Sequence, residues 1–384
     1  YIPLLVKKGF TGEIHCTEPT ESLAEIILKD SAKIQEEEAE RANRHGYTKH
    51  HPAEPLYTLG DVSRALPFFS VHQYHERINL DNSTKFRFLN AGHILGSSLI
   101  DLEINERSIL FTGDLGRQHP LLLSPPERVL STDILVLEST YGDRLHKIAN
   151  VKEELYETIW HTYRKGGVLM IPTFAVERAQ ELIYILSRLQ AENSLPPIPV
   201  YLDSPMGISA TEVMLKMKEW QTLTDKEIYA MDSLVNLVED VQTSRKVVEN
   251  KDPKVVLAGS GMITGGRILH YLDRYIQENR NTILLVGFQA AGTRGRSLEE
   301  GTDELKFFGR YHSVKAEIRK ITSLSAHADQ SEILVWLRQF QSPPQLVLIN
   351  HGEPHASDAL RTKISHELGW TCEVARLNHN YEID

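Results

Sequence analysis

The first 140 residues alternate short apolar runs with turn-forming residues, a pattern typical of β-strands. A charge-rich stretch at 21–45 precedes these runs and predicts a helix, whose mixed charges at 33–40 indicate a solvated face. Residues 46–58 are rich in turn formers and predict a loop. The predicted strands are residues 86–90, 98–104, 108–112 and 132–138.

From about residue 150, short apolar runs alternate with longer stretches of helical period. Buried strands separated by helices predict a parallel, doubly wound sheet, which binds ligands at the carboxyl ends of its strands. A strand is predicted at 315–321, followed by a helix and a strand at 345–350. This last part is expected to return to the first region of the fold. The predicted elements are helices at 151–165, 175–190, 208–220 and 265–278 and strands at 168–172, 199–202, 255–258 and 283–288.

Composition narrows the class of protein. A length of 384 residues indicates two or three domains, and 41% apolar with 24% charged residues is ordinary for a soluble globular protein. Cys16 and Cys372 form no disulfide framework or zinc knuckle, so we expect a reducing compartment and a cytoplasmic location. No apolar run approaches the roughly 18–20 residues that span a bilayer. A net charge of −10 means that a nucleic-acid partner would need a local basic groove.

Five residues with metal-binding or acid–base side chains follow predicted strands, each beside glycines or other small residues. Glycine permits tight turns and lets a ligand approach the backbone, and imidazole and carboxylate groups are typical zinc ligands. Singly, each residue has an ordinary explanation as a hydrogen-bonded histidine, a helix cap or an exposed carboxylate. Their recurrence indicates one site, made of His93, Asp114, Glu138, His327 and His351.

The order of these motifs resembles the metallo-β-lactamase/β-CASP nucleases over essentially the whole chain. The motifs read G-H-x-x-G-S, F-T-G-D-x-G, L-x-E-S-T-Y-G-D, S-A-H-A-D and N-H-G-E. The RNA-cleaving members related to the cleavage-and-polyadenylation endonuclease are most similar, and ribonuclease J is more distant. The resemblance implies an α/β fold: an αββα sandwich (residues 1–142 and 323–384) with an inserted, doubly wound parallel β-CASP domain (143–322).

The resemblance also implies a role for each motif residue. His93 is expected to bind the first of two Zn²⁺ ions, Asp114 to bridge both, and His351 to bind the second. Asp114, Glu138 and His327 are the expected catalytic residues. His327 is expected to act as general acid, since histidine titrates near neutral pH, and Glu138 to orient it.

One family motif is missing. The signature H-x-H-x-D-H occurs nowhere in this chain, which begins at Tyr1-Ile2-Pro3, where that motif is expected to have just ended. We therefore expect the complete gene to encode it immediately upstream. Because zinc sites normally need at least three protein ligands per ion, the residues present should bind a metal pair poorly and leave the chain as given inactive.

Glycine loops and arginines of the inserted region are candidates for contacting substrate. Arg178 lies at a helix start, where backbone N–H groups favour phosphate. Loops containing Ser260 and Gly261, and then Arg294 and Arg296, follow predicted strands. Tight turns explain such loops equally well when each is taken alone. Together with the other motifs they predict contact with the backbone of single-stranded RNA, with weak sequence preference.

Alternative functions stay open. A DNA nuclease of the same superfamily is disfavoured because the DNA-acting members typically carry valine where this chain has His351. An inactive scaffold subunit is disfavoured because all five motif residues are present. A thioester or lactam hydrolase would lack the insertion. The choice between endonuclease and exonuclease, the natural RNA, the metal bound and homodimer formation stay undecided.

Overall fold

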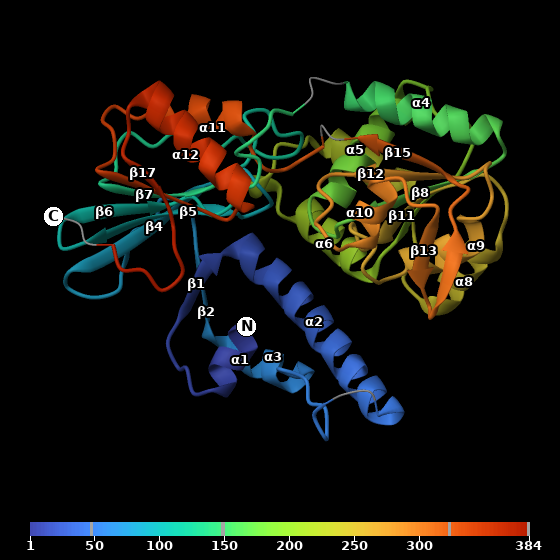
Figure 1. Ribbon diagram of the computed structural model, residues 1–384, viewed down its shortest axis with the longest axis horizontal. Helices are drawn as coiled ribbons and strands as arrows, with labels where there is room; N and C mark the ends of the chain where they lie inside the picture. Colours follow the sequence, from blue (N-terminus) through green and yellow to red (C-terminus); the bar gives the residue numbers. More distant parts are fainter. Residues whose placement is uncertain (47–48, 147–149, 322–323, 382–384) are drawn as a thin grey trace.

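Two large β-sheets organise the protein. The computed structural model describes residues 1–46, 49–146, 150–321 and 324–381. The sheets lie at opposite ends of the longest axis, and the N-terminal helices lie below them in the view of Figure 1. Loops that follow strands of both sheets line one cavity.

The first sheet is mixed and is built from two distant parts of the chain. Strands β3 to β6 form an antiparallel meander, and β6, β7, β16 and β17 pair in parallel. Helices α11 (Gln330–Leu337) and α12 (Pro354–Leu368) lie over it (Figure 1). Its strand order is β17 (Cys372–Val374), β16 (Leu346–Asn350), β7 (Ile134–Glu138), β6 (Arg107–Phe111), β5 (Ser98–Ile104), β4 (Thr84–Asn90) and β3 (Ile78–Asn79).

The second sheet is entirely parallel, which confirms the predicted doubly wound sheet. Its central strands read as largely apolar runs because helices cover both faces, and all six residues of β8 are buried. Helices α4 and α5 pack on one face, and α8 and α9 pack on the other. Its strand order is β10 (Val235–Leu237), β9 (Val200–Asp203), β11 (Lys254–Gly259), β8 (Val168–Thr173), β12 (Thr282–Val286) and β15 (Glu317–Ile321).

The four predicted helices of this second part are present as α4, α5, α6 and α9, with ends that differ from the predicted bounds by up to four residues, whereas α7, α8 and α10 were not predicted. The helix predicted from residue 175 begins at Arg178, because residues 175–177 form a turn in which Glu177 has φ +66°. The helices are α4 (Val151–Arg164), α5 (Arg178–Ala191), α6 (Pro205–Lys216), α7 (Asp225–Leu234), α8 (Val241–Glu249), α9 (Ile268–Tyr275) and α10 (Arg294–Glu299).

Several short elements were not predicted, because their apolar and polar residues do not alternate regularly enough to indicate a helix or a strand. A two-stranded parallel sheet and an antiparallel hairpin are the clearest cases. The predicted charge-rich helix is confirmed as α2, and its Leu23 packs in one apolar cluster with Met214 of α6. Helix α2 spans Glu18–His45, and the elements that were not predicted are α1 (Ile2–Lys7), β1 (Ile14–Thr17), α3 (Leu59–Ala65), β2 (Phe69–His72), β13 (Glu304–Phe307) and β14 (Arg310–Ser313).

Two further points concern the boundaries and the membrane. The predicted boundary between residues 322 and 323 lies outside the described residues. Within the described part of the chain, no helix combines the length and apolar character needed to cross a bilayer.

Candidate active site

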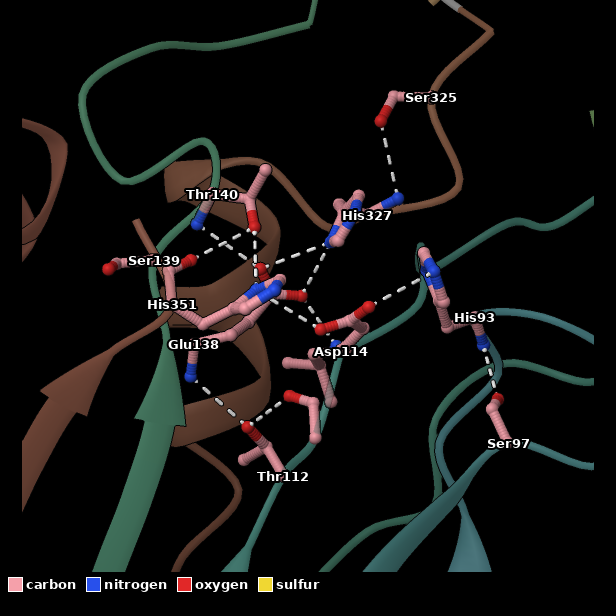
Figure 2. A network of polar contacts seen from close by, with 12 residues as sticks. His93, Ser97, Thr112, Asp114, Glu138, Ser139, Thr140, Ser325, His327 and His351 are labelled. Carbon is pink, nitrogen blue, oxygen red and sulfur yellow. Dashed lines mark hydrogen bonds and ion pairs between the residues drawn. The ribbon is translucent and has the colours of Figure 1, made fainter. Parts of the chain in front are cut away.

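The five motif residues meet at one edge of the first sheet (Figure 2). Glu138 is the last residue of β7, His351 follows β16 directly, and Asp114 lies three residues beyond β6. Because β6, β7 and β16 run parallel, their carboxyl ends bring these side chains to the same edge. The loop after β4 adds His93, and the segment before α11 adds His327.

Asp114 lies between two imidazoles. Its Oδ1 is 3.1 Å from Nδ1 of His351, and its Oδ2 is 3.5 Å from Nε2 of His93. One carboxylate oxygen thus faces each histidine. Ligand atoms of His93, Asp114 and His327 also lie within 4.8 Å of one another. The donor set therefore fits a zinc-type metal centre.

The ring of His93 is held as a neutral imidazole. Burial, with a smaller contribution from His327, lowers the pKa of His93 to about 4. The backbone N–H of His93 donates to Oγ of Ser97 over 3.0 Å, which anchors its loop. Its Nδ1 is buried and makes no hydrogen bond within the described residues. A neutral imidazole with an unsatisfied nitrogen suits a metal ligand.

Glu138 and His327 form a buried pair beside this cluster. Nδ1 of His327 lies 3.0 and 3.1 Å from the two carboxylate oxygens of Glu138. Glu138 also accepts backbone N–H groups of Leu115 at 2.5 Å and Thr140 at 3.2 Å. Burial opposes ionisation of Glu138, but these hydrogen bonds and His327 leave its pKa lowered. Burial likewise opposes protonation of His327, yet the hydrogen bond and charge of Glu138 leave its pKa raised.

The segment carrying His327 is fastened to the sheet through its backbone. Ala328 N–H donates to the carbonyl of Leu115 over 2.8 Å, and His327 forms a β-bridge with Gly116. His146 donates from Nε2 to the carbonyl of His327 over 3.0 Å. These contacts fix the imidazole of His327 over the cluster, with its ring centroid 4.3 Å from that of His93.

Sequence reasoning missed the residues that orient the motif side chains. Oγ1 of Thr140 lies 3.3 Å from Nδ1 of His351, and Oγ1 of Thr112 accepts the backbone N–H of Glu138 over 3.2 Å. Ser97 and His146 have comparable roles. Thr112, Thr140 and Ser97 all lie within the motifs that the sequence analysis singled out. Their position beside a motif residue was the only available signal.

A cavity of about 490 Å³ opens beside His93 and His327. Its walls are largely apolar, and Phe174 and Phe288 contribute aromatic rings from the strand ends of the second sheet. The cavity therefore joins the motif cluster to the inserted region. Its size suits an organic ligand of one or two rings rather than a folded duplex.

The predicted substrate contacts have mixed surroundings. Arg178 lies in the cavity wall, but it is buried and ion-paired with Glu181. Ser260 has φ +93°, and its Oγ accepts the N–H of Thr264 over 3.0 Å, so it stabilises its own loop. Gly261 packs against Phe174: a Cβ there would lie 2.7 Å from that ring. Contact of these three residues with RNA stays a prediction.

Arg294 and Arg296 have protein partners. Arg294 donates to the carbonyls of Lys306 at 2.7 Å and Thr264 at 2.9 Å, which ties two loops together. Arg296 bonds Glu300 over 2.7 Å. The structure thus gives both arginines a structural role, and phosphate binding by them stays a prediction.

A second cluster of possible metal ligands is explained by folding. His146, Asp329 and Glu332 offer ligand atoms within 4.8 Å of one another. Asp329, however, caps α11 through a reciprocal capping box with Glu332, and Glu332 pairs with Arg117 over 3.3 Å. Helix capping and the ion pair account for these residues.

An interrupted mixed sheet with imidazole and carboxylate groups at its strand ends defines a hydrolase fold of the metallo-β-lactamase type. Two family models match the chain: the Beta-Casp domain at residues 179–298 and the Zn-dependent metallo-hydrolase RNA specificity domain at residues 311–375. The first match lies within the second sheet and its helices, and the second includes His327 and His351.

Curated relatives agree with this fold. Ribonuclease TTHA0252 of Thermus thermophilus is 32% identical over 360 residues, covering 92% of this chain and 78% of the relative. An RNase J-like protein of Methanocaldococcus jannaschii is 32% identical, covering 90% and 77%. Transcription termination factor FttA of Methanosarcina mazei is 27% identical, covering 96% and 58%. The chain belongs to the β-CASP metallo-β-lactamase family of ribonucleases.

Proposed function

We propose that this protein is a zinc-dependent ribonuclease that hydrolyses phosphodiester bonds of single-stranded RNA. The observation that carries the proposal is the position of Asp114 between His93 and His351, with the Glu138–His327 pair directly beside it. Two relatives are named as a ribonuclease and as an RNase J-like protein, which supports RNA as the substrate.

The metal would be held by His93, Asp114 and His351. Asp114 has one oxygen toward each imidazole, which suits a carboxylate shared by two ions. When bound, a zinc pair supplies a water of lowered pKa and neutralises charge on the phosphate. The contacts of Asp114 with both imidazoles and the name of the matched RNA specificity domain support this assignment.

His327 would donate the proton to the leaving oxygen. Its Nδ1 is hydrogen-bonded to Glu138, which leaves Nε2 available for the substrate and favours the protonated ring. Glu138 is a positioning residue because its two oxygens also accept backbone N–H groups of Leu115 and Thr140. The buried pair thus presents an oriented acid at the cavity wall.

The remaining assignments belong to the same proposal. Residues 1–142 and 323–384 form the catalytic domain, and 143–322 form the inserted domain. RNA occupies the cavity between the motif cluster and Phe174, where Arg178 contacts phosphate when substrate displaces Glu181. Cys16 and Cys372 are both free thiols, which supports a cytoplasmic location.

Cleavage of matched single-stranded RNA and DNA tests the proposal. The protein expressed from its complete gene and loaded with zinc should cleave RNA faster than DNA of the same sequence. Preferential cleavage of DNA would reassign the substrate. Absence of cleavage with zinc bound would instead favour a scaffold subunit.

A further inference from the structure

An antiparallel hairpin at the outer end of the second sheet presents two exposed aromatic rings. Strands β13 and β14 are joined by Phe308 and Gly309. Phe308 is 53% exposed, and Tyr311 is 64% exposed. Figure 1 shows β13 beside α8 and α9, away from the first sheet. The folded core therefore leaves more than half of each of these side chains uncovered.

The turn is costly for the residue that occupies its first position. Phe308 has φ +48° and Gly309 has φ +78°, as a two-residue type I′ turn requires. Asparagine, aspartate and glycine favour this position, whereas a bulky side chain is strained there. Strain that exposes an aromatic ring indicates selection for something other than stability.

A lysine lies over the ring of Tyr311, and an imidazole packs against the ring of Phe308. The Nζ of Lys306 lies 5.3 Å from the ring centroid of Tyr311, its cross-strand neighbour, and makes no ion pair within the described residues. Arg310 is paired with Asp273 over 2.6 Å, so it adds little net charge. His270 packs against Phe308 with 5.2 Å between ring centroids and supports that ring. Exposed rings beside a lysine are typical of single-strand nucleic-acid surfaces.

The hairpin is connected to the catalytic cavity. Arg294 donates to the carbonyl of Lys306 in β13 and to the carbonyls of Ile263 and Thr264. Residues 260–266 form the glycine loop that follows β11, and Met262 of this loop lines the cavity beside His327. The loop that lines the cavity is therefore tied to the hairpin through Arg294.

We infer that the β13–β14 hairpin binds single-stranded RNA outside the catalytic cavity, by stacking bases on Phe308 and Tyr311 and pairing a phosphate with Lys306. This inference rests on the proposed function. It predicts that long substrates bind more tightly than substrates that fill only the cavity, without any added base specificity.

The test replaces Phe308 with the residue that its turn prefers. Phe308→Asn relieves the backbone strain, so its melting temperature should equal or exceed that of the parent. Fluorescence anisotropy with chelator present compares RNAs of ~6 and ~30 nucleotides. The variant should raise the Kd of the longer RNA about tenfold, since each stacked base contributes appreciably, and leave the Kd of the shorter RNA unchanged.

The matched control is Tyr229→Ala in α7, because Tyr229 is 73% exposed in the same part of the molecule. It should alter neither Kd. An unchanged Kd of Phe308→Asn for the longer RNA would overturn the inference, as would an equal loss in Tyr229→Ala. A changed oligomeric state by light scattering, with RNA binding unaffected, would assign the hairpin to a second copy. If the protein cleaves RNA but Phe308→Asn binds the longer RNA as the parent does, only this inference is refuted. If Phe308→Asn weakens binding but the parent does not cleave RNA, only the proposed function is refuted.

Discussion

His93, Asp114 and His351 could be predicted because each lies beside glycine at a strand end. Small neighbours mark places where the backbone turns sharply beside a ligand. The orienting contacts of Thr140 and His146 could not be predicted in this way. A hydroxyl or imidazole that bonds an atom distant in sequence leaves no local spacing to detect.

Gly116 shows how little room the site allows. A Cβ at this residue would lie 1.9 Å from the carbonyl oxygen of Gly92 and 2.7 Å from the backbone nitrogen of His93. Gly116→Ala should therefore displace the His93 loop, lower the free energy of unfolding by about 3 kcal/mol and reduce zinc binding. Chemical denaturation and metal analysis measure both effects.

Gly265→Ala is the matched control for this substitution. A Cβ at Gly265 meets no heavy atom within 4 Å, and its φ is not positive. The control should change the unfolding free energy by no more than about 0.5 kcal/mol. If Gly116→Ala behaves like the control, the loops that carry Gly116 and His93 do not pack as closely as described.

Secondary structure elements were predictable in proportion to their burial and length. Strands such as β8 and β12 are buried throughout, so they appear as uninterrupted apolar runs. The three-residue strand β10 and the hairpin β13–β14 carry no such run. The start of α5 was misplaced because the positive φ of Glu177 depends on tertiary packing that propensity does not reflect.

Strand β11 contains a buried cation with a measurable cost. Lys254 is its first residue and is 2% exposed; burial lowers its pKa to about 8, with Asp252 opposing the shift. The unfolded chain has a lysine pKa of ~10.4. Between these values the unfolded state binds more protons, so this residue makes stability rise with pH.

Lys254→Met should therefore stabilise the protein at pH 7, on the order of 1 kcal/mol. This advantage over the parent should shrink as pH rises from about 8 to 10, because the parent loses its buried charge. Urea denaturation of both proteins at each pH measures the difference. A difference that is constant with pH would show that Lys254 is not perturbed in the folded state.

At the scale of the whole molecule, the site depends on a chain that leaves the first sheet and returns to it. β7 and β16 are neighbours although the whole second sheet lies between them in sequence. This return was predicted from the change in the pattern of apolar and polar residues along the chain and from the family resemblance. The exact cavity between the two parts was not, since it depends on side chains such as Phe174 and Phe288 from the second sheet.

The net charge of −10 also matters at this scale. An acidic surface repels nucleic acid at long range, so binding must depend on local contacts in the cavity and along the hairpin. Contacts in the catalytic cavity and stacking on the hairpin are therefore expected to supply most of the binding energy for RNA.

The central claim is that His351 binds zinc and His327 acts as the general acid. It is tested most directly by measuring zinc content and single-turnover RNA cleavage on the same samples of His327→Ala and His351→Ala, made in the protein from its complete gene. His351→Ala should lose bound zinc. His327→Ala should retain zinc and cleave about 10²–10⁴-fold more slowly, as expected for loss of a general acid. If His327→Ala loses zinc as His351→Ala does, or cleaves at the parental rate, the proposed roles of these histidines are contradicted.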